Sequence, residues 1–288
     1  MSTDTTAAPK APKAPAAAVT PDTWVPPANL RVTQLRVLRS EWSKFWTLRS
    51  SYITLAATVL GMIGFGVLFS AVTANRWPVM HAAAKLEFDP TRVSLRGFEL
   101  AQLIIGVLGV LLVTGEYGTG MIRASMSAAP KRLPVVWAKA AVFTAVAFVA
   151  GEVSAFVAFF AGQALLSSQH IQTSLSAPEV LRTVFGTGLY LTMVGLLGVA
   201  LGWIIRSTAG GIATLFGLLL VLPALGDALP QDWAQHIVPY LPSNAGQSIT
   251  AIHPDPGMLG PWTGFGVFCL YAVVGFVAAA ILVKRRDA

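Results

Sequence analysis

The sequence predicts an all-α, multi-pass membrane protein with six transmembrane helices. Of its 288 residues, 55% are hydrophobic and only 11% are charged, whereas an ordinary soluble domain carries about 25% charged residues. A helix needs roughly 20 mainly apolar residues to cross ~30 Å of hydrocarbon. Six stretches come close to that length, and the fifth is the tightest fit. They lie at residues 51–73, 97–114, 136–166, 184–205, 208–225 and 263–283.

The basic residues predict the orientation of these spans, because Lys and Arg near span ends are retained on the cytoplasmic side. With both termini inside, thirteen span-flanking Lys and Arg residues are cytoplasmic and five are external. The net charge of +7 is spread along these flanking positions. It does not form the single basic surface of a nucleic-acid-binding domain, so we expect no nucleic-acid partner.

Two segments precede the first span. Residues 1–28 are rich in Ala and Pro, and we expect a disordered cytoplasmic tail. Residues 29–50 predict an amphipathic helix lying at the lipid headgroups, because Trp and basic residues suit that boundary; the alternative is a plain extension of the first span. Its apolar side holds Leu35, Leu38, Trp42, Phe45 and Trp46, and its polar side holds Arg36, Arg39, Ser40, Ser43 and Lys44.

The connection after the second span reads "GEYGTGMIRASMSAAPKRLP". The second span is expected to end near Thr114, and Gly115, Gly118 and Gly120 lower the helix propensity after it and permit a sharp bend at the membrane face. A short helix follows, which we expect Pro130 and Pro134 to close. The predicted result is a cytoplasmic knob that exposes charge of both signs, from Glu116 and Arg123.

The sequence contains none of the nucleotide-binding, zinc-binding or hydrolase motifs for which we searched it. Gly115 and Gly120 have the spacing of a Walker phosphate loop, but Met121 and Ile122 stand where that motif needs Lys and Ser or Thr. We therefore expect this chain not to hydrolyse ATP itself. No zinc-binding H-E-x-x-H and no G-x-S-x-G elbow occurs. An intramembrane enzyme without a recognisable motif, or a structural membrane scaffold, remains as an alternative.

Glu152 is the residue that the membrane should tolerate least. It follows Lys139 by thirteen positions, about 20 Å along a helix, and a charge at such depth costs about 3 kcal/mol on insertion scales. We expect it to face a partner, a cavity or a subunit interface, either as a packing residue or beside a transport path. Gln163 and Gln102 are its candidate partners.

Between the last two spans, residues 226–262 mix short apolar pieces with Pro and Gly. We expect a re-entrant external segment instead of a solvated loop, because its apolar residues can dip into the interface. These residues are Trp233, Ile237, Val238, Tyr240 and Leu241.

Taken in order, several of these segments resemble the permease subunits of ATP-binding-cassette (ABC) transporters of the type-2 exporter class, particularly those of actinobacteria. The resemblance runs over nearly all of residues 31–284. It is carried by "LRSEWSKFWTLRSSY", "GVLLVTGEYGTGMIRASMSAAPKRLPVVWAKA", "LGWIIRSTAGGIATLFGLLLVLPAL" and "YLPSNAGQSI".

The resemblance implies a permease of the bacterial plasma membrane that works with two copies of a separate ATPase and with a second permease, as a homo- or heterodimer. ATP and Mg would bind to the ATPase, so this chain would need no cofactor, metal or catalytic residue. The connection after the second span would be a coupling helix that contacts the ATPase through Glu116, Tyr117, Gly118, Gly120, Ile122 and Arg123. Residues 29–50 would be a connecting helix against membrane lipid, with Arg39, Trp42, Lys44 and Trp46, and residues 227–260 would close the external side of the export path.

Overall fold

The computed structural model describes residues 33–128, 132–226, 228–254 and 256–285. These residues belong to one compact unit, 32–288, and within them every regular element is a helix. The tail predicted for residues 1–28, the first residues of the amphipathic segment, and Pro130 lie outside the described residues.

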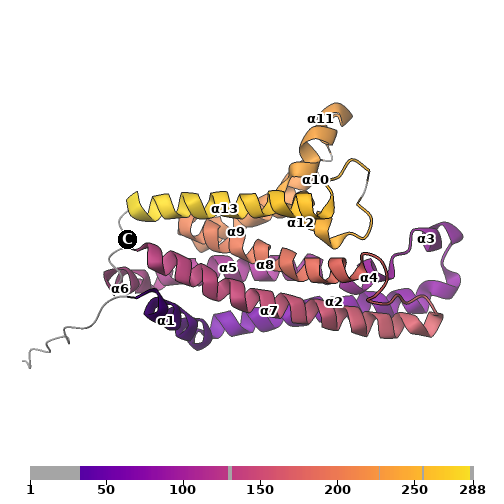
Figure 1. Cartoon of the computed structure of the whole chain (residues 1–288), viewed down its shortest axis with the longest axis horizontal. Coiled ribbons are helices and arrows are strands. Elements are labelled where there is room, and N and C mark those ends of the chain that lie inside the picture. The colour runs from indigo at the N-terminus through magenta and orange to yellow at the C-terminus, as the bar shows by residue number, and fades with distance from the viewer. Residues whose placement is uncertain (1–32, 129–131, 227, 255, 286–288) are drawn as a thin grey trace, which may run out of the picture. The chain divides into compact units, whose positions relative to one another are not determined.

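Six helical stretches are long and apolar enough to cross a membrane (Figure 1), which is the make-up of a multi-pass membrane protein. Each predicted span lies within one of them, so the six-helix prediction is confirmed. The fifth is the shortest at 19 residues. The helices are α2 (Arg49–Arg76), α4 with α5 (Pro90–Leu95, Phe98–Thr119), α7 (Leu133–Leu166), α8 (Val180–Ile205), α9 with α10 (Thr208–Phe216, Leu222–Gly226) and α13 (Pro261–Arg285).

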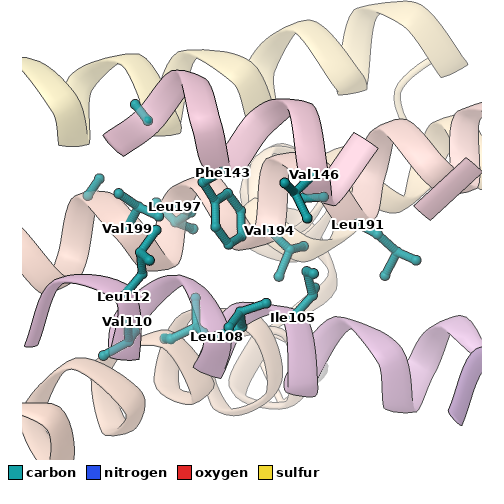
Figure 2. Packing of buried hydrophobic residues seen from close by; sticks show 14 of the residues in the cluster. Ile105, Leu108, Val110, Leu112, Phe143, Val146, Leu191, Val194, Leu197 and Val199 are labelled. Carbon is teal, nitrogen blue, oxygen red and sulfur yellow. The ribbon is translucent and has the colours of Figure 1, made fainter. Parts of the chain in front are cut away.

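Helix α8 is the centre of the bundle. It packs against α5, α7 and α13, while α2 packs against α5 and α7. In its most apolar stretch 72% of the residues are buried, against 22% for α2. Glycines let α5 and α8 approach closely, because a Cβ on Gly109 would meet the carbonyl oxygen of Gly195 at 2.1 Å. Figure 2 shows the side chains that fill the space between α5, α7 and α8, among them Leu108, Phe143 and Val194.

Two short helices lie at the end of the bundle where α5 finishes. Helix α1 (Gln34–Thr47) packs against α7, and α6 (Met121–Ala128) follows α5 (Figure 1). Phe45 is fully buried on α1, whereas Trp42 and Trp46 are exposed and stack edge to face. The amphipathic helix is therefore present, and its contact with lipid stays a prediction.

The segment before α13 is mostly helical and in part buried. Helix α11 (Gln231–Ile237) projects from the bundle in Figure 1, but α12 (Pro242–Gln247) packs on α13. Gly246 leaves no room for a side chain between the rings of Tyr190 and Phe268. A wholly solvated loop is thus wrong for residues 238–250, and entry of this segment into a membrane stays a prediction.

Candidate functional site

Helix α5 runs further than the sequence predicts. It continues through Gly115 and Gly118 and ends at Thr119, because the left-handed residue that closes it is Gly120, with φ of 74°. Glycine adopts this backbone without steric cost. Adding a residue to an existing helix is also much easier than starting one. The helix therefore extends five residues beyond the predicted end near Thr114, the bend comes at the third of the three glycines, and Glu116 lies in the last helical turn.

Glu116 is buried, with only 3% of it exposed. The prediction that it exposes its charge was therefore wrong. Its Oε1 atom accepts hydrogen bonds from Lys139 Nζ of α7 at 2.9 Å and from Lys44 Nζ of α1 at 3.3 Å. A carboxylate removed from water needs such partners.

Both lysines also bind Glu41 of α1. Lys139 Nζ lies 2.7 Å from Glu41 Oε2, and Lys44 Nζ lies 2.6 Å from Glu41 Oε1. Lys44 donates as well to the hydroxyl of Ser125 in α6, at 2.9 Å. We call these five residues, Glu41, Lys44, Glu116, Ser125 and Lys139, the ionic cluster. The ionic cluster joins α1, α5, α6 and α7.

Two acids and two lysines balance the charge of the ionic cluster. Burial desolvates the Glu41 carboxylate, but Lys139 and Lys44 outweigh that effect and hold the pKa of Glu41 below its ordinary value. Burial likewise opposes the charge of Lys44, and Glu41 and Glu116 overcome it, so the pKa of Lys44 is raised. Both shifts favour the charged forms of Glu41 and Lys44.

Sequence reasoning assigned no role to Glu41 or Lys139. A signal for each was present: Glu41 precedes Lys44 by three positions, which places both on one helix face. Lys139 lies inside the predicted span 136–166, where a lysine needs a partner. What the sequence does not contain is the distance between α1 and α7.

The exposed residues of the α5–α6 junction are mostly small and uncharged. We call residues 118–124 the elbow; Gly118, Gly120 and Arg123 are exposed there. Ile122 is buried, and Tyr117 is half-buried with its ring facing the Arg206 guanidinium at 5.1 Å. Of the six predicted contact residues, the structure thus brings three to the surface and turns the other three wholly or partly inward. In α1, Arg39 joins Trp42 and Trp46 on exposed positions, whereas Lys44 points into the ionic cluster.

Glu152 and the two glutamines do not form the predicted group. Gln163 donates to Ser94 Oγ at 2.8 Å and accepts from the backbone N–H of Thr173, which fixes α7 to α4 and to the segment that follows α7. Gln102 accepts from the Tyr190 hydroxyl at 2.5 Å. Both carboxylate oxygens of Glu152 are buried without a hydrogen-bond partner among the described residues. The pairing predicted for Glu152 was therefore wrong.

A cavity of about 430 Å³ opens at the far end of the bundle from the ionic cluster. Its charged and titratable lining residues are Glu87, Asp89, Arg92, Glu99 and His253. Asp89 caps α4 by accepting from the N–H groups of Thr91 and Arg92. Within the described ranges no group of three His, Cys, Asp or Glu residues has the arrangement of a metal site.

Comparison of the chain with known protein families and with curated proteins finds no match.

Proposed function

We propose that this chain is the membrane-embedded permease subunit of an ABC transporter of the type-2 exporter class, driven by a separate ATPase that binds at the elbow. The observation that carries the proposal is the ionic cluster. It ties the segment next to the exposed elbow to α1 and α7 through buried charge pairs, so a push on the elbow moves those helices together.

The proposed mechanism follows from the stiffness of these connections. ATP binding draws two ATPase subunits together and displaces the elbow of each permease. Helices α5 and α7 move with it, because Glu116 and Lys139 join them at this end. The path between two permease chains then opens to the outside. The shift in equilibrium can be no larger than the difference in the ATPase's affinity for the two arrangements.

The proposal gives Glu116 a positioning role instead of a direct contact. Contact falls to the exposed groups, above all Arg123, whose charge an acidic patch on the ATPase would recognise. Truncating Glu116 would disturb the ionic cluster as well as any coupling. Arg123→Glu is therefore the sharper test.

We would purify the tagged chain from its native membrane in mild detergent and identify co-purifying proteins by mass spectrometry. The expected result is an ATPase with a Walker motif, whose recovery falls about tenfold with Arg123→Glu at an unchanged amount of permease. Arg76→Glu is the matched control, since Arg76 is also exposed but lies at the far end of α2.

Two results would overturn the proposal. One is a purified chain that never carries an ATPase, or carries it equally well with Arg123→Glu. The other result concerns topology. In a Cys269→Ser background, the variant Gly118→Cys can be labelled in intact cells with a thiol reagent that does not cross the membrane. Reaction from the outside only would place the elbow outside the cell. An intramembrane enzyme, by contrast, would show activity as the isolated chain without ATP.

A further inference from the structure

Glu152 lies within α7, thirteen residues after Lys139 of the ionic cluster. At 1.5 Å per residue the two positions are about 20 Å apart along the helix. The carboxyl group packs against α8 at Gly188, where an added Cβ would meet the carboxyl carbon at 2.5 Å. Gly188 therefore makes the space that Glu152 occupies.

An unpartnered carboxylate in hydrocarbon is unfavourable. Both oxygens of Glu152 lack a hydrogen-bond partner among the described residues. Its charge must be neutralised by a proton or by a cation from outside the chain. The described part of the fold gives this carboxylate no cation, whereas it gives Glu41 and Glu116 their own lysines.

The surroundings select the kind of cation. Phe148 and Phe156 lie one helical turn before and after Glu152, on the same face of α7. Phe185 of α8 packs edge to face on Phe148, with ring centroids 6.1 Å apart. Aromatic faces attract organic cations, whereas an inorganic cation such as Ca²⁺ requires six or more oxygen ligands.

The bundle surface beside Glu152 is apolar and exposed, whereas the carboxylate oxygens themselves are buried beneath it, so a ligand reaches them only if the side chain turns outward. Val149 and Val153, on either side of Glu152 in α7, are 59% and 53% exposed. Phe185 is exposed as well. In a bilayer this face meets acyl chains or another membrane helix, so a ligand that arrives here must itself be apolar.

We propose that Glu152, with Phe148 and Phe156 one turn away on α7 and Phe185 packed on Phe148 from α8, binds a lipophilic organic cation, such as an amine or quaternary ammonium carried on an apolar body. The carboxylate pairs with the charge, and the rings surround the apolar groups. A lipid headgroup amine is a poor occupant, because it stays at the membrane surface and not at the depth of Glu152. The site does not depend on the proposed transport function.

The test uses the full chain in lipid nanodiscs and radiolabelled tetraphenylphosphonium in equilibrium dialysis, with no ATPase present. We expect saturable binding of one cation per chain, which neutral triphenylphosphine does not displace. Glu152→Gln keeps the shape of the side chain and should weaken binding about tenfold or more. Glu99→Gln, an exposed carboxylate elsewhere, should leave binding unchanged.

A second measurement guards against a folding defect. Dicyclohexylcarbodiimide, which reacts with carboxyl groups in apolar surroundings, should modify Glu152, and tetraphenylphosphonium should protect it. Wild-type chain without saturable binding, or equal binding by Glu152→Gln, would overturn the proposal. A third result would also overturn it. If the wild type binds no cation and Glu152→Gln changes the oligomeric state, then Glu152 pairs with another chain and not with a ligand.

Discussion

Two buried acidic sites in this protein meet the same electrostatic cost in opposite ways. In the ionic cluster, Glu41 and Glu116 receive charged hydrogen bonds from Lys44 and Lys139. In the middle of α7, Glu152 has no such partner among the described residues. The first arrangement fixes four helices to one another, whereas the second leaves one carboxyl group without a partner among the described residues.

The difference predicts how mutation at each site changes the stability of the protein. A balanced cluster loses stability when one member is removed, because the remaining charges stay buried. Replacing an unpaired buried carboxylate should cost the protein little or no stability, because the replacement removes the free-energy cost of burying that charge. The loss of stability on mutation therefore distinguishes a charged residue that holds the fold together from one that does not.

The largest expected effect is that of Lys139→Met. This change leaves Glu41 and Glu116 facing each other with only Lys44, which is partly exposed. We expect a loss of about 3–5 kcal/mol of stability, measured as a lower thermal midpoint in detergent. Adding Glu116→Leu to Lys139→Met restores a one-to-one charge balance and should recover much of the loss. If the double variant is no more stable than Lys139→Met, the ionic cluster does not act as a balanced unit.

A smaller effect should follow acidification. The pKa of Glu41 is lowered from 4.5 in the folded chain, so its contribution is present above pH 4.5 and is lost as the pH falls through the lower folded value. The difference in thermal midpoint between wild type and Glu41→Gln should be constant from about pH 5 to 8 and shrink below pH 4.5. A difference that grows with acidity would contradict the assignment. The pKa of Lys44 is raised from 10.5, so its contribution is fully present below pH 10.5 and is lost only as the pH rises through the higher folded value.

The smallest effect should be that of Glu152→Gln on stability. Replacing an unpaired carboxyl by an uncharged amide of the same shape should leave the thermal midpoint unchanged or raise it slightly. The measurement is thermal unfolding in the same detergent without added cations. A loss as large as that of Lys139→Met would show that Glu152 has a structural partner and would remove the contrast between the two sites.

The sequence predicted the spans far better than the contacts between them. A run of apolar residues predicts a span because the free energy of placing a segment in lipid depends on the residues of that segment alone. The partners of Glu116 depend on how α1 folds back on α7, a distance that no local pattern encodes. Gly120 illustrates the same limit: three nearby glycines predict a bend, but only tertiary structure decides which of them adopts the left-handed conformation.

The brevity of the fifth span has a consequence for the surrounding lipid. Nineteen residues reach about 28 Å at 1.5 Å each, and the π-helical turn at Gly217–Val221 lies within them. The 34 residues of α7 reach about 51 Å. Beside α9 and α10 the length is just short of the ~30 Å of hydrocarbon, which favours slight thinning of the bilayer, whereas α7 exceeds it and must lean or extend beyond the hydrocarbon. The protein is therefore expected to be sensitive to lipid chain length, with shorter chains relieving the elastic strain along its thin side.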